Sequence, residues 1–296
     1  MTVATTTHDD QVTDVQLANY AKLIYKVTGI RVSPRKKMLL SNRIRRRLRT
    51  TGIQSFEAYY AKLRKLPVDD PEWDAFLQEI TTHETYLFRD ESHWKWFCNS
   101  YLKELADDAA KGCRDKELRI WSAACSTGDE AYTIASCVAD RLPNPTTWKI
   151  DILGTDIGID AVKKAKRAVF GKRAMQNVPD KFRRRFFKKQ DKADAWSAKP
   201  ALTQWVRFKT HNLLDRLNEP AFDVIFLKNV LIYFDPNSKK AAIKQLSHVL
   251  KTGGVLITGA AEGLGELPSD FERASPWLHR KTAATSKPTV RRGGTR

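Results

Sequence analysis

The stretch LRIWSAACSTGDEAY, residues 118–132, decides the fold that we expect for this chain. It opens with a short apolar run of strand-forming residues, passes through small residues and Gly128, and continues as DEAYTIASCVADRL with helical spacing. A buried strand that turns directly into an amphipathic helix is typical of an α/β domain. The chain from residue 118 onward is therefore predicted to alternate strands with helices.

The same alternation continues toward the C-terminus. Further strand-like runs are KIDILGTD (149–156), WVRFKTHN (205–212), FDVIFLKN (222–229) and GGVLITGA (253–260), and helical segments lie between them. Short, almost wholly apolar strands indicate a parallel sheet that is buried on both faces. We expect a doubly wound α/β domain over residues 96–281, with its ligand beyond the carboxyl ends of the strands.

The first part of the chain predicts an all-α domain over residues 12–80. Apolar residues recur at helical spacing from residue 15 to residue 30, and the same spacing returns at Leu40, Ile44 and Leu48. Residues 81–95 are expected to be a linker that contributes to the active site. The basic segment 282–296 is expected to be a disordered tail.

The net charge of +18, from 52 Lys and Arg against 34 Asp and Glu, points to an anionic partner. Nucleic acid, anionic lipid and an acidic protein all fit this charge. Part of the positive charge lies on a predicted helix, in which Arg43, Arg46 and Arg47 fall on the face opposite the apolar positions. Such a face can also be no more than a solvated surface. RNA is disfavoured, because the aromatic residues that stack on bases are not evident in residues 33–50.

Composition also indicates the cellular compartment, and the cysteine pattern bears on disulfides and metal binding. No window approaches the roughly 18 apolar residues of a membrane span, and the N-terminus lacks a secretion signal, so we expect a cytoplasmic protein without membrane insertion. The four cysteines are spread singly without a C-x-x-C pair, which argues against a disulfide framework and a metal site. A monomer is the default expectation.

Acidic residues follow the first two predicted strands. Asp129 and Glu130 come directly after Gly128, where small residues let the backbone approach a ligand. Two carboxylates would repel a pyrophosphate but suit an ammonium group. An ordinary strand-to-helix turn, with acids favourable to the helix dipole, is the competing interpretation. The fingerprint G-x-G-x-x-G is absent, which also argues against a nicotinamide oxidoreductase.

Asp156 ends the second strand, at the position where nucleotide-binding α/β proteins place an acid against the ribose hydroxyls. Helix capping is its alternative role. A nucleoside that carries an amino acid in place of phosphates would satisfy Glu130 and Asp156 together, and S-adenosylmethionine is such a ligand. After a later strand, Asn229, Tyr233 and Phe234 fall at the expected rim of the ligand site.

Together these segments resemble the chemotaxis receptor methyltransferases of the CheR family. The similarity runs from about residue 15 to residue 281, and the matching stretches include ITTHETYLFRDE (80–91), IWSAACSTGDEAYTIA (120–135), VRFKTHNLLD (206–215), FDVIFLKNVLIYFD (222–235) and LKTGGVLITGAAEGL (250–264). The resemblance implies a class I S-adenosylmethionine-dependent methyltransferase domain with a small inserted β-subdomain at about 186–206. It also implies methylation of glutamate side chains on the cytoplasmic signalling domains of chemotaxis receptors.

The resemblance further implies a role for individual residues. Glu130 would hold the methionine ammonium and Asp156 the ribose, Asn212 and Leu213 would contact the adenine, and Asn229 would hold the methionine end. Gly128 and Lys228 are the further candidate cofactor-binding residues. Thr85 and Arg89 of the linker would close over the cofactor, Arg89 orienting the acceptor carboxylate, and Tyr233 would lie beside the transferred methyl group. The basic set Arg43, Arg46 and Arg47 would meet the receptor.

Three positions depart from the family pattern. His83 stands in place of a common asparagine, Ala124 in place of a frequent glycine, and Lys228 in place of the arginine that usually precedes Asn229. Lysine cannot reproduce a bidentate contact made by arginine. The inserted subdomain lacks a glycine-rich insertion, so we expect receptor binding without a C-terminal peptide tether. Two alternatives remain: a cofactor-binding regulator without turnover, and a methyltransferase for another acidic protein.

Overall fold

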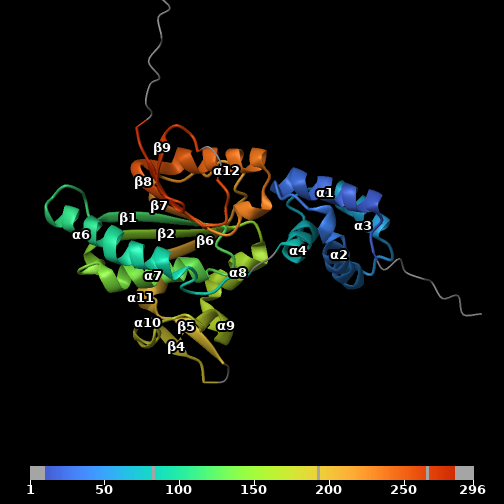
Figure 1. Cartoon of the computed structure of the whole chain (residues 1–296). Coiled ribbons are helices and arrows are strands. Elements are labelled where there is room, and N and C mark those ends of the chain that lie inside the picture. Colours follow the sequence, from blue (N-terminus) through green and yellow to red (C-terminus); the bar gives the residue numbers. More distant parts are fainter. Residues whose placement is uncertain (1–10, 82–83, 192–193, 265–266, 284–296) are drawn as a thin grey trace, which may run out of the picture.

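The computed structural model describes residues 11–81, 84–191, 194–264 and 267–283, so His83 and the predicted tail from residue 284 onward lie outside the described residues. An all-α domain lies against one end of an α/β domain (Figure 1). Among the described residues, no helix has the length and apolar character that a membrane crossing requires.

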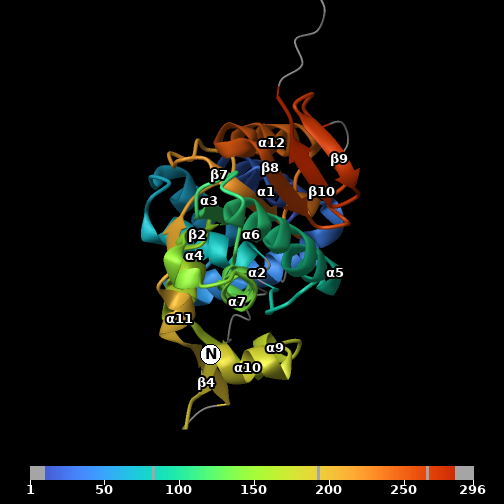
Figure 2. The same cartoon turned by 90° about the vertical axis from the view of Figure 1, so that its left-hand side faces the viewer.

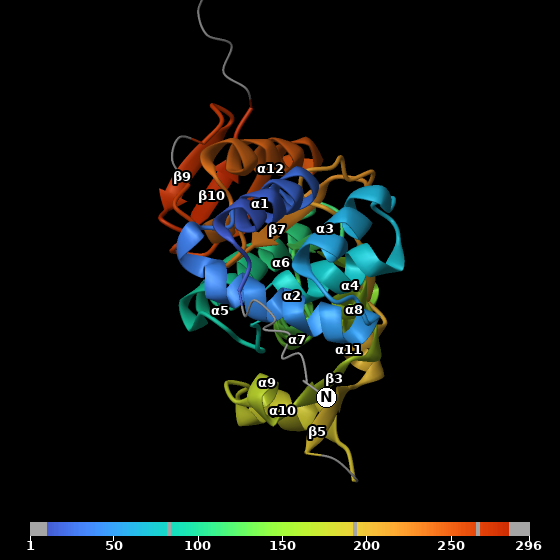
Figure 3. The same ribbon diagram turned by 90° about the vertical axis from the view of Figure 1, so that its right-hand side faces the viewer.

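The N-terminal domain is a small cluster of helices (Figure 3). Three of its α-helices begin at a capping side chain. Thr13 forms a capping box with Gln16, and the Ser55 and Asp70 side chains accept backbone N–H bonds at two further starts. Tyr20 and Phe76 lie fully buried at its centre. The helices are α1 (Asp14–Thr28), η1 (Pro34–Lys36), α2 (Lys37–Thr51), α3 (Phe56–Lys65) and α4 (Pro71–Ile80).

The α/β domain is built on a seven-stranded sheet in the order β6-β2-β1-β7-β8-β10-β9. The first five strands of this order are parallel, and β10 and β9 add an antiparallel edge. The reversal of strand order at β1 creates the crevice in which such sheets bind ligands. The strands are β1 (Glu117–Ala123), β2 (Lys149–Asp156), β6 (Val206–Thr210), β7 (Phe222–Leu227), β8 (Leu250–Thr258), β9 (Phe271–Ser275) and β10 (Leu278–Lys281).

Helices cover both faces of this sheet (Figures 1 and 2). Ile120 packs into the core under α7, whereas its neighbour Trp121 packs into the core under α12. Side chains of a strand point alternately to opposite faces, so a strand covered on both sides is apolar on both faces. The helices are α5 (Glu91–Trp96), η2 (Phe97–Tyr101), α6 (Leu102–Ala110), α7 (Asp129–Arg141), η3 (Pro145–Thr147), α8 (Ile159–Arg167), α11 (Pro200–Thr203), η4 (Leu231–Tyr233) and α12 (Pro236–Val249).

A small antiparallel sheet is inserted between α8 and β6 and projects from the domain (Figures 1 and 2). Its strands are β3 (Val169–Gly171), β4 (Phe187–Lys189) and β5 (Ala195–Ala198), with helices α9 (Lys172–Met175) and α10 (Asp180–Phe186). The insertion starts at Val169 rather than near residue 186, because β3 pairs with β5. Asp140 of α7, whose side chain is buried, anchors it by accepting hydrogen bonds from Lys181 and Arg185.

The helical domain is fixed at the carboxyl ends of the strands by backbone contacts. Ile30 forms a β-bridge with Phe234, and the amide of Arg31 donates to the carbonyl of Tyr233 at 2.9 Å. Gly29 ends α1 with φ +72°, and a Cβ there would lie 2.7 Å from Leu214 Cδ1. These contacts place the end of α1 beside the predicted ligand site.

Candidate active site

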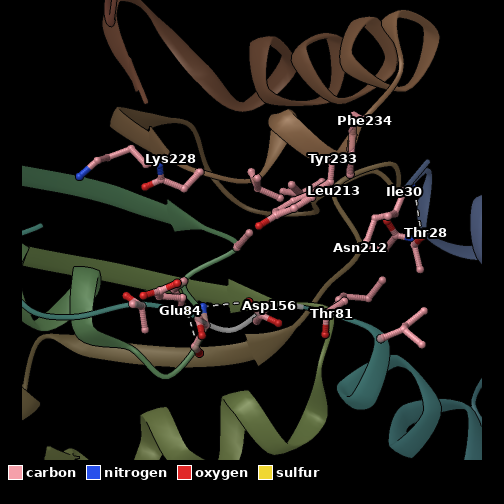
Figure 4. A pocket seen from close by; sticks show the side chains of 18 of the residues that line it. Thr28, Ile30, Thr81, Glu84, Asp156, Asn212, Leu213, Lys228, Tyr233 and Phe234 are labelled. Atoms are coloured by element: carbon pink, nitrogen blue, oxygen red, sulfur yellow. Dashed lines mark hydrogen bonds between the residues drawn. The ribbon is translucent and has the colours of Figure 1, made fainter. Parts of the chain in front are cut away.

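A pocket opens between the two domains at the carboxyl end of the sheet, and residues of both domains line it (Figure 4). Every residue assigned to the cofactor from the sequence lines this pocket except Gly128. The lining residues that those assignments anticipated are Thr85, Arg89, Glu130, Asp156, Asn212, Leu213, Lys228, Asn229, Tyr233 and, from the basic helix, Arg43.

The loop after β1 approaches the pocket in a conformation that few side chains adopt. Ala124, Ser126 and Gly128 all have positive φ, at 59°, 51° and 89°. A Cβ at Gly128 would lie 2.9 Å from Ala165 Cβ and 3.1 Å from Phe208 Cζ. Glycine at 128 is therefore required by conformation and by space, whereas Ala124 occupies a left-handed position that the family's usual glycine fills without strain.

Substitution of Gly128 by alanine is expected to destabilise the protein by about 2 to 5 kcal/mol, from left-handed strain together with overpacking. Gly112 is a matched control, because it has φ +73° and no atom lies within 4 Å of the position that a Cβ would occupy there. Gly112→Ala should cost only the strain, about 1 to 2 kcal/mol. Urea unfolding measures both free energies, and equal costs would contradict the steric argument.

Glu130 is the acid in the first turn of α7 that faces the pocket. Its Oε1 accepts the Ser122 hydroxyl at 2.8 Å, and its Oε2 lies 3.7 Å from Lys228 Nζ. Burial raises the pKa of Glu130, and the charge of Lys228 opposes that rise. A second cation beside this carboxylate would favour its ionised form further, as the assignment of a ligand ammonium requires.

Asp156 lies on the pocket and accepts two backbone amides, one of them at the start of α8. Its Oδ1 accepts the amide of Gly158 at 3.0 Å, at the start of α8, and its Oδ2 accepts the amide of Ser126 at 2.8 Å. The carboxylate therefore ties the loop after β1 to the loop after β2. Each carboxylate oxygen has a second lone pair, so ribose hydroxyls can still bind from the pocket side.

The linker carries Arg89 over the pocket on a constrained backbone. Phe88 and Asp90, on either side of Arg89, both have positive φ. The carbonyl of Arg89 accepts hydrogen bonds from the Trp94 indole at 2.6 Å and from Lys228 Nζ at 3.0 Å. The Arg89 guanidinium donates to the carbonyl of Glu84 at 2.7 Å and lies 5.7 Å from the Tyr86 ring centre. The remaining N–H groups of this guanidinium can bind a carboxylate.

Lys228 links the linker to the ammonium site. Its side chain is 2% exposed, and its Nζ lies 3.2 Å from Asp90 Oδ2, 3.7 Å from Glu130 Oε2 and 4.9 Å from the Trp94 ring centre. A single ammonium thus serves the linker backbone and the two carboxylates. In this chain Lys228 holds the linker closed on the sheet, and its compact charge suffices for that role.

Asn229 and Tyr233 belong to the loop after β7, which begins with Asn229 at φ 61° and ends in η4. Tyr233 is half-buried, lies on the pocket and has Lys36 Nζ 5.3 Å above its ring. Leu213 is buried against the same pocket. The Asn212 amide instead donates to the carbonyl of Val27 at 2.8 Å, so this side chain joins the two domains.

The three arginines of α2 have different surroundings. Arg43 lines the pocket and donates to the carbonyl of Ile80, and burial lowers its pKa. Arg46 is 54% exposed and pairs with Glu79 at 2.6 Å. Arg47 is 14% exposed and pairs with Glu72, to which Tyr59 also donates. Both acids belong to α4, so burial and not pairing separates Arg47 from the expected common basic face.

Several pocket residues were not anticipated from the sequence. Thr28 and Ile30 come from the end of α1, Trp94 from α5 and Ser126 from the loop after β1. The glycine that ends α1 was the one visible signal for the first two, since it marks a turn at which the chain changes direction. The other contacts depend on how distant segments meet.

The polar groups of the pocket fit S-adenosylmethionine. Glu130 offers a carboxylate that is 15% exposed for the ammonium, and Asp156 offers a buried carboxylate for the ribose. Behind these carboxylates, the ring of Phe208 packs against the backbone of Gly128 and Gly154, which have no side chain. A Cβ at Gly154 would lie 2.4 Å from Phe208. Lys228 Nζ, beside Glu130, is held by Asp90 and by the carbonyl of Arg89 in the linker.

Comparison with known proteins agrees with this geometry. Two family models match the chain: the all-alpha domain of CheR methyltransferase over residues 16–81, and its SAM binding domain over residues 83–277. The chemotaxis protein methyltransferase of Escherichia coli (strain K12) is 32% identical over 263 residues, which cover 87% of this chain and 87% of that protein.

Two further relatives match the chain over a similar length. The chemotaxis protein methyltransferase of Borreliella burgdorferi is 31% identical over 254 residues, covering 85% of this chain and 89% of that protein. Chemotaxis protein methyltransferase 2 of Vibrio cholerae is 31% identical over 264 residues, covering 88% of this chain and 89% of that protein. The two matched domains span both halves of the pocket, and the chain belongs to the CheR methyltransferase family.

Proposed function

We propose that this protein transfers a methyl group from S-adenosylmethionine to glutamate side chains of chemotaxis receptors and forms glutamate methyl esters. One observation carries the proposal. A single pocket has two carboxylates, those of Glu130 and Asp156, at its cofactor end, and Arg89 and Tyr233 line the same pocket. The names of the curated relatives supply the chemotaxis context.

The reaction needs alignment more than proton transfer. A bound S-adenosylmethionine supplies an electrophilic methyl group on a sulfonium. A carboxylate oxygen forms the new bond to the methyl carbon, and the electron pair of the broken C–S bond remains on sulfur. A glutamate with a pKa of about 4.3 is already ionised at neutral pH, so no general base is required.

The chain's own residues provide the alignment. Arg89 binds one oxygen of the acceptor carboxylate through a charge-assisted hydrogen bond and leaves the other oxygen to attack. Tyr233 packs beside the methyl group, and Asn229 holds the methionine end of the cofactor. Lys228 keeps the linker closed, which excludes water from the site and strengthens these contacts.

Charge favours an acidic protein as the partner. The chain carries +18, and exposed basic residues line the approach from the helical domain, including Arg31, Lys36 and half-exposed Arg46. Arg43 and Arg46 are the receptor-facing arginines in this proposal, with Arg47 held inside the domain. Attraction between opposite charges orients such an encounter.

The test is incubation with methyl-labelled S-adenosylmethionine and receptor signalling domains that carry either glutamate or alanine at the candidate acceptor positions. We expect label on the glutamate form alone, released as methanol by base. Cofactor binding without transfer would support a regulator instead. Transfer to a different acidic protein, but not to receptors, would replace the acceptor and keep the chemistry.

A further inference from the structure

Glu262 lies in the turn after β8 and is 1% exposed, although it carries a carboxylate. A carboxylate is almost never fully buried unless it has hydrogen-bond or charge partners. Glu262 has no place among the residues that bind the cofactor or the acceptor in the proposed function, and it is not on the pocket wall. Its surroundings therefore need a separate explanation.

The partners of Glu262 are backbone amides of the loop that carries Asn229 and Tyr233. Its Oε1 accepts the amide of Val230 at 3.2 Å, and its Oε2 accepts the amide of Ile232 at 3.0 Å. Ile232 lies in the turn η4, and Val230 is the residue directly before it. The side chain of Val230 does not cap this turn. The first N–H groups of a helical turn lack partners within the turn, so a distant carboxylate caps it.

The segment around Glu262 is built to keep this carboxylate in place. A Cβ at Gly259 would lie 3.0 Å from Glu262 Oε1 and 3.3 Å from the amide nitrogen of Asn229, so glycine leaves room for both. On the other side, Lys239 Nζ of α12 donates to the carbonyls of Glu262 and Gly263, at 2.6 and 3.2 Å. The turn is thus anchored to α12 while its carboxylate reaches the loop.

The charge environment of Glu262 makes it sensitive to pH. Burial raises the pKa of Glu262 to about 7, although the hydrogen bonds from the loop amides oppose the rise. Lys239 contacts the backbone of the turn, and Lys228 and Tyr233 flank the loop. Among the described residues, no cation forms an ion pair with this carboxylate through its side-chain oxygens.

We propose that Glu262 is a positioning residue, whose carboxylate holds the loop from Asn229 to Tyr233 in the arrangement that places Tyr233 on the pocket. The inference rests on the proposed function, because it assigns this loop to the methyl-transfer end. Only the ionised carboxylate offers both oxygens as acceptors to the loop. Protonation turns one oxygen into a donor that faces an N–H group, and the loop then loses a hydrogen bond.

Activity and stability should therefore respond to pH in opposite directions. Turnover should rise as pH increases through about 7, because the loop is best held when Glu262 is ionised. Folding stability has the reverse sign: the folded pKa, about 7, exceeds the ordinary 4.5, so the contribution of Glu262 is fully present below 4.5 and is lost as pH rises through 7.

The test compares wild type, Glu262→Gln and the control Glu272→Gln, an exposed glutamate on β9. We expect Glu262→Gln to lower kcat about 10-fold while affinity for S-adenosylmethionine stays within about threefold, since one of the two hydrogen bonds that hold the loop is lost. The rise of kcat near pH 7 should disappear in this variant. Hydrogen exchange of the Val230 and Ile232 amides should also become faster.

If Glu262→Gln keeps the turnover, the pH profile and the loop exchange of the wild type, the inference is overturned. If that variant does not fold, the question is decided by hydrogen exchange of the Val230 and Ile232 amides in the wild type between pH 6 and pH 8, corrected for the intrinsic rate. Protection of these amides that does not increase with pH contradicts the inference. Gly259→Ala provides a second route, because its Cβ would press on Glu262 Oε1 and should lower kcat similarly. Failure of the proposed function can be distinguished from failure of this inference. In that case the wild type would methylate no receptor, but the exchange of the loop amides would still depend on Glu262.

Discussion

Arg89→Ala is expected to lower kcat by about 100-fold or more while S-adenosylmethionine affinity changes by no more than a few fold. Loss of a group that orients a reactant can lower the rate by about 100-fold, because a misplacement of the reacting atoms by about 1 Å has an effect of this size. The linker backbone should stay in place, because Trp94 and Lys228 hold it through the carbonyl of Arg89 and not through its side chain. Single-turnover methylation and calorimetric titration of the cofactor measure the two quantities.

Arg64→Ala is the matched control for this experiment. Arg64 lies 5.8 Å from the Tyr60 ring centre in the helical domain, much as Arg89 lies 5.7 Å from that of Tyr86, but it is not on the pocket. The control removes the same charge and a similar ring contact, and it should leave turnover unchanged. Retained turnover in Arg89→Ala would remove the orienting role, and an equal loss in both variants would point to overall charge.

Glu130→Gln is expected to weaken S-adenosylmethionine binding by roughly 10- to 100-fold. A hydrogen bond to a charged group contributes about 1.5–3 kcal/mol, and the substitution removes the charge that the ligand ammonium needs. It also leaves buried Lys228 with Asp90 as its remaining carboxylate partner among the described residues. The amide has nearly the shape of the carboxylate, so the Ser122 contact and the fold should survive.

Asp129→Asn tests whether the effect belongs to Glu130 or to any acid at the start of α7. Asp129 precedes Glu130 and is buried, but it accepts the Thr127 hydroxyl and does not line the pocket. Its substitution should change cofactor affinity by less than about threefold. Titration of both variants decides between the assignments, and equal losses would show that the helix N-terminus acts through its total charge.

Local sequence pattern was sufficient for the layered fold. The strand from Glu117 to Ala123 is apolar at its centre because Ile120 and Trp121 enter separate cores on opposite faces of the sheet. Glycine at 128 followed by Glu130 predicted the pocket-facing turn, because conformation and charge are both local properties there. The family resemblance rested on several such stretches in a fixed order, and the two matching family models confirm it.

Tertiary structure decided what lies between those stretches. The inserted sheet begins at Val169 because β3 pairs with a strand much later along the chain, Ala195–Ala198, which no local pattern reveals. Arg47 has the sequence context of Arg46, yet its side chain is 14% exposed against 54% for Arg46, because it packs beside Glu72 of another helix. The role of Lys228 likewise depends on the linker that packs over it.

The amino-acid sequence by itself determined the helices, the strands, the sharp turn at Gly128 and the acids at the strand ends. These features follow from periodicity, backbone freedom and charge within a few neighbouring residues. Only the tertiary structure decided that Thr28 joins the pocket, that Asn212 bonds to the helical domain and that Glu262 caps the loop of Tyr233. Such contacts join residues far apart in the chain, and they form only when whole elements pack to bury apolar surface.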